Sequence, residues 1–460
     1  MWRVHTGRTN PYCDGMSRRS FVQTGMVGMG SLTLADMLQA KEQSASKSKS
    51  TKDTSVILIW LDGGPSHLDL YDLKPDAPAE YRGMWSPIRT NVSGIEISEM
   101  FPKQAKVADK FSIIRSLHHN NGDHFTGGHY MLTGRGGVSG ADTRGRYPFI
   151  GAIATKMTGP RRSGMPAHAA IPYAMSIGIR PGYFGGNYLG NEYNPFETEG
   201  DANASNFKVR NLSSIKDLSL DRLQDRRTLL HDFDNARRQM EATGGLASLD
   251  KFQTQAFDMV TGPAAAKAFD LTTESDKVRD SYGRHSWGQS TLLARRLVEA
   301  GSTWVSIHLG GWDHHWDLEA GMNRYLPQVD DLVAGLFTDL AERGLYDKVT
   351  VVLCGEFSRT PKINDGGNGG PPGSKGTPGR DHWGNSMFTL IGGGGIKGGT
   401  IVGSTTSKGD SPRDRPLTPS DLHATLFHTL GVDQNLSFLD HAGRPTPAID
   451  KGEVIRELLV

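Results

Sequence analysis

The sequence predicts an α/β fold in which a mainly parallel central sheet carries helices on both faces. Three short apolar runs, residues 55–61, 303–309 and 350–354, are each followed within two residues by glycine. Short runs of this kind, rich in β-branched residues, are typical of strands buried on both sides. Helical patterns separate them, as the crossover between parallel strands requires. Each run ends near an Asp, Glu or His, and open α/β sheets place their chemistry at that edge.

The other expected elements continue the alternation of strands and helices. Leu332, Leu336 and Leu340 recur at spacings of four and predict a long amphipathic helix. A stretch rich in glycine and proline, residues 366–379, predicts a loop. We expect further strands at 111–117 and 386–391, and helices at 101–110, around 131–135, and at 221–243, 249–260, 286–300, 322–343 and 418–430.

Length and composition favour one large domain. The 460 residues can bury a large core, which we place at 54–460 with a helical insertion at about 178–300. The 51 basic and 50 acidic residues leave the chain close to neutral, without the basic face that a nucleic-acid partner needs. Cys13 lies ahead of an expected export signal, so the mature chain would keep only Cys354 and form no internal disulfide.

The amino-terminal residues predict an export signal at 1–40. An arginine pair at 18–19 precedes a modestly apolar stretch, 21–38, that three glycines interrupt. The pair resembles a twin-arginine signal, which implies the twin-arginine export machinery as a partner and the periplasm as the destination. An ordinary amphipathic helix is the alternative, although glycine at this density weakens helices. We expect a disordered spacer at 41–53 and no stable membrane anchor in the mature protein.

Carboxylates and imidazoles follow the predicted strands. Divalent metals need such groups from different chain segments, with a position left open for substrate. Any one of them has a structural alternative, such as capping a turn or a helix end. Their joint occurrence indicates a site for one or two divalent metal ions, with zinc, calcium, manganese and magnesium all open. The candidate ligands are Asp62, Asp313, His315, Glu356 and His382.

A histidine-rich loop follows the strand expected at 111–117. Four of the 16 histidines fall within residues 118–129, which suggests a shared role. Imidazoles five residues apart in a loop that contains glycine can fold back onto one ion or one oxyanion. We therefore expect His124 and His129 to face Asp62 and Asp313 across one cleft. The first two histidines of the loop are expected to cap the strand end or to pack.

Arg359 and Arg380 are candidate substrate-binding residues. A guanidinium offers paired donors in a fixed fork, which suits the oxygens of a tetrahedral ester. The alternative is that both arginines form surface salt bridges.

Taken together, the motifs resemble an uncharacterised family of twin-arginine-exported bacterial proteins. That family is similar to sulfatases and belongs to the alkaline-phosphatase-like superfamily, and the resemblance runs from about residue 55 to the end. It implies a sandwich with a mainly parallel central sheet. It also implies that the five candidate ligands hold one or two metals around a phosphate or sulfate ester. The motifs that carry it lie at residues 62–66, 311–315, 355–361, 379–383, 421–426 and 443–445.

The chain departs from sulfatases at the nucleophile. Sulfatases carry a C-x-P-S-R segment that ends in Leu-Thr-Gly-Arg, and setting 132–135 on that ending puts His124 at the nucleophile position. Thr126 falls where sulfatases have proline. Either Thr126 or a nearby serine is the nucleophile, or His124 is phosphorylated or binds metal, or a water activated by the metal attacks directly.

Two functions fit these observations. The first is an exported, metal-dependent hydrolase of phosphate or sulfate esters, acting on a small-molecule or glycan ester. In this function the metal ions held by the five ligands neutralise the ester oxygens, and Arg359 orients the ester. His124 and Thr126 are candidates for the chemical step. His129 and Arg380 contact the substrate. The second is a non-catalytic binding protein of the cell envelope that kept the superfamily fold and lost the nucleophile.

Overall fold

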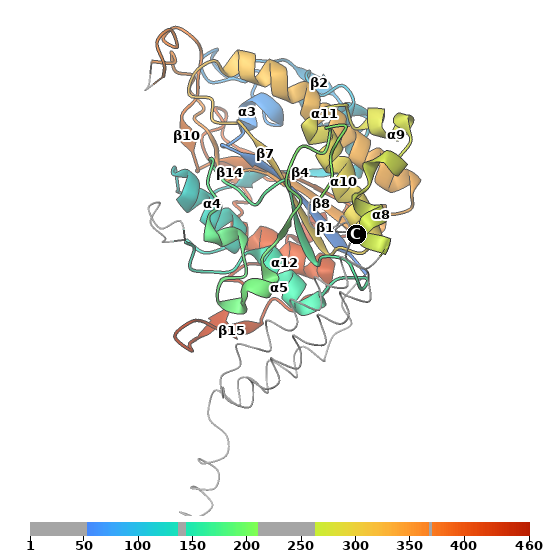
Figure 1. The fold of residues 1–460 in the computed structure, drawn as a ribbon. Helices are drawn as coiled ribbons and strands as arrows, with labels where there is room; N and C mark the ends of the chain where they lie inside the picture. Colours follow the sequence, from blue (N-terminus) through green and yellow to red (C-terminus); the bar gives the residue numbers. More distant parts are fainter. Residues whose placement is uncertain (1–52, 137–143, 210–262, 368–369) are drawn as a thin grey trace, which may run out of the picture. The chain divides into compact units, whose positions relative to one another are not determined.

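The computed structural model describes residues 53–136, 144–209, 263–367 and 370–460 (Figure 1). The expected export signal, almost all of the spacer, and the helices expected at 221–243 and 249–260 lie outside these residues. The chain divides into two compact units. The described part of the smaller one is 436–447, where β15 (Ser437–Leu439) and β16 (Pro445–Pro447) form an antiparallel hairpin.

The larger unit is built on an eight-stranded sheet. In spatial order its strands are β12 (Ile401–Val402), β4 (Ser112–Leu117), β11 (Met387–Gly392), β8 (Val349–Cys354), β1 (Ser55–Asp62), β7 (Trp304–Gly310), β5 (His168–Ile171) and β6 (Phe196–Glu197). The inner strand β1 pairs in parallel with both β7 and β8. Among the described strands of this sheet, only β11 runs antiparallel to its neighbours. The predicted mainly parallel α/β fold is therefore confirmed.

Helices cover both faces of the sheet (Figure 1). One layer holds α8 (Pro263–Phe269), α9 (Asp276–Ser281), α10 (Ser286–Ala300) and α11 (Leu318–Glu342), and the other holds α4 (His124–Thr133), α5 (Ile150–Thr158) and α12 (Pro419–Leu430). Within the segment expected to be an insertion, α10 packs on β1 and β7, and β6 pairs with β5.

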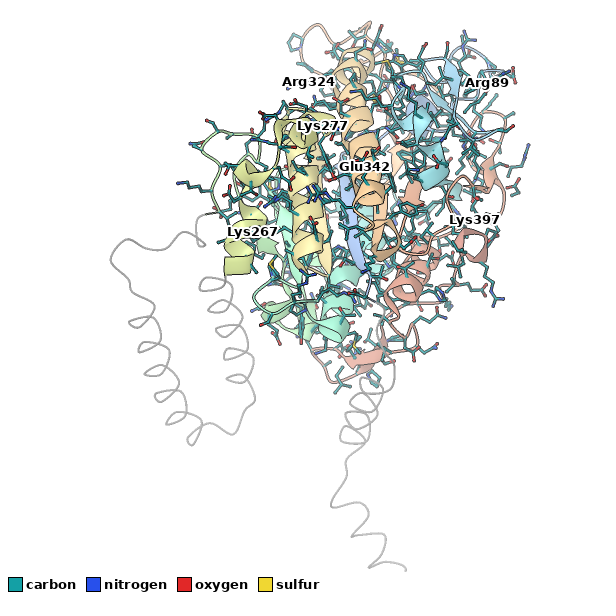
Figure 2. The ribbon with its side chains drawn as sticks, turned by 90° about the vertical axis from the view of Figure 1, so that its right-hand side faces the viewer. Arg89, Lys267, Lys277, Arg324, Glu342 and Lys397 are labelled. Carbon is teal, nitrogen blue, oxygen red and sulfur yellow. The ribbon has the colours of Figure 1, made fainter. Side chains whose placement is uncertain are left out.

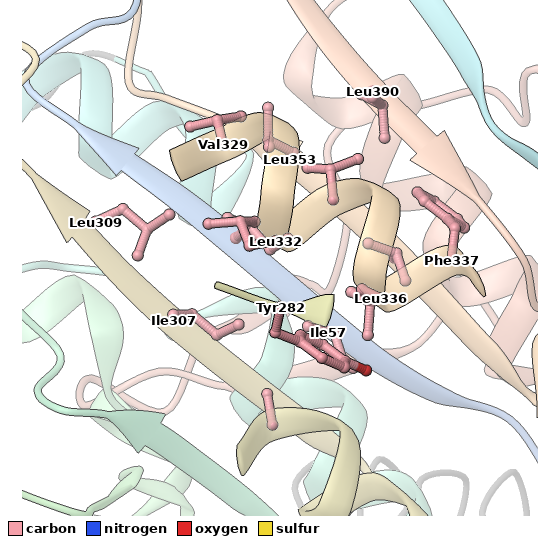
Figure 3. Packing of buried hydrophobic residues seen from close by; sticks show 14 of the residues in the cluster. Ile57, Tyr282, Ile307, Leu309, Val329, Leu332, Leu336, Phe337, Leu353 and Leu390 are labelled. Atoms are coloured by element: carbon pink, nitrogen blue, oxygen red, sulfur yellow. The ribbon is translucent and has the colours of Figure 1, made fainter. Parts of the chain in front are cut away.

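The long helix α11 confirms the helix predicted from leucine spacing. Its inner face points Leu332 and Leu336 at Ile57 of β1 and Ile307 of β7 (Figure 3), and all four side chains are buried. Burying one such side chain contributes about 1.5–3 kcal/mol relative to leaving it in water. The charged end of the helix, at Glu342, is exposed (Figure 2).

Smaller elements connect the sheet and the helices. They are α3 (His67–Leu70), β2 (Pro87–Arg89), β3 (Glu96–Ser98), β9 (Ser358–Arg359), β10 (His382–Trp383), β13 (Ser404–Thr405), β14 (Pro412–Asp414), and 3-10 helices at Gln104–Lys106, Ala108–Lys110, Gly182–Phe184, Asn187–Leu189, Asn191–Tyr193, Leu271–Thr273, Tyr346–Lys348 and Arg456–Leu458. The short helix predicted at 101–110 is not continuous. It is two 3-10 turns, separated at Val107, whose φ of −127° leaves the helical region.

No helix in the described ranges is both long enough and apolar enough to cross a bilayer. The fold brings the candidate functional residues to one edge of the sheet. Because β1, β4, β7 and β8 run in the same direction, the loops that follow them emerge together. The candidate ligands from distant parts of the sequence lie on these loops.

Candidate metal centre

Three side chains that could hold one ion, His124, Asp313 and His382, meet at this edge, and His315 contacts the last two; we call the four residues the Asp313 cluster. Asp313 Oδ1 lies 3.1 Å from His315 Nε2 and 3.1 Å from His382 Nε2. Asp313 Oδ2 lies 3.4 Å from His124 Nε2. The Nε2 atoms of His315 and His382 are themselves only 2.9 Å apart. One carboxylate is thus surrounded by three imidazoles, each through the same ring nitrogen.

The other ring nitrogen of each histidine is held by an oxygen. The three Nδ1 contacts are His124 to Glu356 Oε1 at 2.7 Å, His315 to Asp381 Oδ1 at 2.6 Å, and His382 to Gly122 O at 2.7 Å. Carbonyl and carboxylate oxygens accept, so we assign the proton of each neutral ring to Nδ1. In the neutral form each Nε2 then directs a lone pair into the cluster, whereas in the protonated ring of His124 it faces Asp313 as a donor. The 2.9 Å contact between His315 Nε2 and His382 Nε2 needs either a proton on one ring or a cation beside both.

Close packing of two loops positions Asp313. Trp312 N donates to Asp62 O at 3.1 Å and thereby joins the loop after β7 to the loop after β1. Gly63 has a φ of +117°, and a Cβ there would lie 2.6 Å from Asp313 N. Only glycine fits both the backbone conformation and the space.

The first turn of α4 positions His124. Asp123 caps the helix by accepting from Thr126 N at 2.9 Å, and His124 is the first helical residue. A Cβ at Gly127 would lie 3.0 Å from Glu356 O, so this turn sits directly against the loop after β8. The predicted proximity of His124 to Asp313 is confirmed. The Thr126 hydroxyl donates to Asp123 Oδ1 at 3.0 Å.

Arg359 differs from both expectations for it. It is fully buried, so it is not a surface salt bridge, and its guanidinium already donates to protein oxygens. Nη2 lies 2.5 Å from Asp313 Oδ1 and also donates to Gly63 O, while Nε donates to Gly64 O at 2.8 Å. In β10, His382 pairs with Arg359 of β9. Arg359 therefore orients Asp313 and does not present a free fork to substrate.

Arg380 is likewise buried, and its donors are engaged by protein oxygens and not directed at a substrate position. Its Nε lies 3.0 Å from Asp69 Oδ2, and its Nη atoms donate to the carbonyl oxygens of Thr360, Pro361 and Arg82. All of these donors serve to hold the loops that carry the cluster.

Two of the five predicted ligands lie beside the cluster instead of in it. Asp62 accepts from Ser176 Oγ, Ile177 N and His308 Nε2 at 2.8–3.0 Å. Glu356 is fully buried and stands behind His124. Burial raises the pKa of Glu356, and within the described chain its Oε2 has no hydrogen-bond partner.

His129 is also separate from the cluster, against our expectation. It is 1% exposed, stacks edge-on with Tyr147 and Tyr183, and hydrogen-bonds Arg135 O through Nδ1 at 2.9 Å. Five residues after His124 on an α-helix, a side chain points to a different face. The expected loop is helical here, which is why the i, i+5 argument fails.

The charges of the cluster stabilise the ionised carboxylate. At Asp313, burial favours the neutral acid, but the three imidazoles and Arg359 outweigh it and hold the pKa well below its usual range. At His124, burial opposes the cation, but hydrogen bonds to Asp313 and Glu356 raise the pKa to about 9. The hydrogen bond to Asp313 also raises the pKa of His315. Asp313 is therefore ionised, as a metal ligand must be.

Sequence reasoning missed the oxygens behind the histidines. Asp381 immediately precedes His382 in the sequence, but it serves His315. The carbonyl of Gly122 has no sequence signal at all. His124 was expected beside Asp313 and, as one of several alternatives, at the nucleophile position, but its contact with Glu356 was not expected.

Several solved structures resemble this chain. The PsFucS1 sulfatase from Pseudoalteromonas sp. is 12% identical, with 87% of this chain and 72% of that chain covered and a TM-score of 0.38. A phosphonate monoester hydrolase from Silicibacter pomeroyi is 12% identical, with coverages of 88% and 76% and a TM-score of 0.35. The lipoteichoic acid synthase LtaP from Listeria monocytogenes is 9% identical, with coverages of 86% and 78% and a TM-score of 0.34.

No curated protein matches the chain. A family model does match, over residues 53–459, which is nearly the whole of the described chain. This protein therefore belongs to the family described as protein of unknown function DUF1501.

Proposed function

We propose that this protein is an exported, metal-dependent hydrolase of phosphate or sulfate esters whose metal centre is the Asp313 cluster. One observation carries the proposal. Three Nε2 atoms converge on one carboxylate while each Nδ1 is fixed by an oxygen. The resemblance of the sequence motifs to sulfatase-like proteins supplies the ester class.

The donors present fit a divalent ion of the zinc type. Three imidazoles and one carboxylate are ligands that zinc takes, and a five-coordinate ion would bind all four and keep one position open for substrate. Oxygens behind the rings, such as Asp381 Oδ1 at 2.6 Å from His315 Nδ1, are typical of metal-binding histidines. A bound ion would supply positive charge to the ester oxygens, where negative charge develops.

The chain's own residues would orient this centre and provide the nucleophile. Arg359 holds Asp313, and Glu356 holds His124. Thr126 remains our candidate nucleophile, because its hydroxyl already donates to Asp123 Oδ1 at 3.0 Å, the arrangement in which a carboxylate accepts the proton of an attacking hydroxyl.

Metal analysis and turnover test the proposal together. Protein purified without chelator should contain a transition metal, and it should cleave 4-nitrophenyl phosphate or 4-nitrophenyl sulfate. Asp313→Asn should lose both properties, while Asp347→Asn, the same change at an exposed residue in the 3-10 helix before β8, should keep them. Thr126→Ala should abolish turnover and retain the metal, and Thr126→Ser should preserve turnover.

Absence of metal from the folded protein, together with no turnover after zinc, manganese, calcium or magnesium is added, would refute the proposal. Bound metal without turnover of any ester would instead favour the non-catalytic envelope protein.

Export is a separate proposal, and it rests on the arginine pair at 18–19 and the apolar stretch that follows. Changing both arginines to lysine should leave the full-length precursor in the cytoplasm. Unchanged processing and export would mean that another route carries the chain.

A further inference from the structure

A cavity lined by both polar and apolar side chains lies apart from the Asp313 cluster. Its volume is about 320 Å³, within the range of small-molecule sites. It is formed by the loop after α3, by β2 and β3, by the middle of β4 and by the loop after β13, and no residue of the cluster lines it. The lining residues that matter here are Asp72, Lys74, Pro75, Ala77, Pro87 and Arg115.

Two cations share one buried carboxylate in this cavity. Asp72 is 3% exposed, and its Oδ1 lies 3.0 Å from Lys74 Nζ and 3.8 Å from Arg115 Nε. Its Oδ2 accepts from the Thr405 hydroxyl. The acceptor capacity of Asp72 is therefore largely used, and this one buried carboxylate does not balance the charge of both cations.

Arg115 has donors to spare. Its side chain is 19% exposed, and the guanidinium makes one hydrogen bond to the described chain, from Nη2 to Glu96 O at 3.0 Å. Arg115 Nε is buried without a hydrogen-bond partner among the described residues. Leaving a buried donor unsatisfied costs about 1–3 kcal/mol, more when it is charged. A native protein retains such a group when something else supplies the acceptor.

The backbone at Lys74 is also unusual. Its φ of +51° is left-handed, a conformation that costs a residue with a side chain roughly 1–3 kcal/mol and that clusters at ligand clamps. This conformation accompanies the placement of Nζ against Asp72 and Thr405 O.

The other charges at the cavity are two carboxylates, one of which, Glu96, interacts with Arg115. Asp76 and Glu96 are exposed at its rim, where solvent and salt screen their charge. Beside the buried guanidinium, Pro75 and Pro87 provide apolar surface for the rest of a ligand.

We propose that this cavity binds a small molecule through an oxyanion group, a carboxylate, sulfate or phosphate, with Arg115 and Lys74 as the donors. Arginine suits such a group because its planar fork donates two parallel hydrogen bonds. The site does not depend on the proposed hydrolase activity, and it would exist in a non-catalytic protein as well.

Anion titrations of the metal-free protein test this site. Sodium sulfate, phosphate and acetate are titrated separately by calorimetry at constant ionic strength, with chloride as the reference. At least one of the three should bind saturably. Arg115→Gln should weaken that binding at least tenfold, about 1.4 kcal/mol, and Lys74→Met should also weaken it. Arg89→Gln removes the same charge from an exposed residue of β2 (Figure 2) and should bind like the wild type.

Three results would overturn the proposal. They are no saturable binding of any of the salts, equal binding by the wild type and folded Arg115→Gln, and binding that Asp313→Asn loses while Arg115→Gln keeps it. If circular dichroism shows that Arg115→Gln does not fold, Arg115→Lys replaces it, because that change keeps the charge and removes the fork. Wild-type affinity in Arg115→Lys would then contradict the assigned role of the guanidinium.

Discussion

Asp381→Asn tests whether the histidines of the Asp313 cluster are held for a metal ion. Asp381 Oδ1 accepts from His315 Nδ1 at 2.6 Å, on the side of the ring that faces away from the cluster. Asparagine has nearly the same shape and keeps an acceptor oxygen, but it removes the negative charge. The substitution therefore makes His315 a poorer ligand without deleting any atom of the cluster.

The expected magnitude follows from what the substitution leaves in place. Loss of the group behind a metal-bound histidine typically weakens metal binding by roughly 10–100-fold. Because the amide of asparagine still accepts from Nδ1, we expect the lower end, about tenfold or 1.4 kcal/mol. Asp313→Asn, which changes a ligand itself, should weaken binding much further.

Competition between the metal-free protein and a chromogenic chelator measures zinc affinity directly at neutral pH. Asp347→Asn is the matched control, since it removes the same charge from an exposed residue at the other end of β8. If Asp381→Asn binds zinc as tightly as both the wild type and this control, His315 is not a ligand. The ion would then be held by the other three residues, His124, Asp313 and His382.

Three further predictions concern stability. Asp69→Ala leaves the buried Arg380 without the carboxylate that it pairs with, and it should lower the free energy of unfolding measured in urea by about 3–5 kcal/mol. A change under about 0.5 kcal/mol would contradict this prediction. Gly63→Ala should lower both the free energy of unfolding and the affinity for zinc. Gly94 also has a positive φ but has open space around it, so Gly94→Ala should lower both quantities less. Equal effects of the two substitutions would mean that the contact of Gly63 with the loop after β7 is unimportant. Burial lowers the pKa of His423 to about 4, so between about pH 6.5 and pH 4 the unfolded chain binds a proton at this residue that the folded chain excludes. The contribution of neutral His423 to the free energy of unfolding is therefore complete above about pH 6.5 and is lost as the pH falls towards 4. His423→Gln should therefore flatten the fall in unfolding free energy over that range by roughly 3 kcal/mol, and parallel curves for the two proteins would refute it.

Strand and helix periodicity predicted most of the described architecture. The apolar runs that form β1, β7 and β8 are almost entirely buried, so their apolar composition alone was enough to predict them as strands. The antiparallel direction of β11 could not be predicted from its composition, because a strand buried on both faces has the same composition in either direction.

The candidate site was predicted less completely, for a geometric reason. Strand ends pointed to Asp313, and the motif residues His315 and His382 lie beside it. Sequence spacing could not separate a group inside the cluster from one immediately behind it, such as Glu356. It also could not tell a guanidinium free for substrate from one already satisfied by carbonyl oxygens, as in Arg359, because those partners are backbone atoms.

The central position of β1 governs the order in which this chain can mature. The hydrogen bond from Ser55 Oγ to Ser302 O spans 247 residues, and the one from Gly63 N to Glu356 Oε1 spans 293. A ribosome must therefore synthesise most of the protein before β1 meets either neighbour, and until then an apolar strand with two open edges has no partner. Pairings this distant form slowly and leave the nascent chain prone to aggregation. We therefore expect the nascent chain to need protection of the unpaired β1 strand until its neighbours have been synthesised.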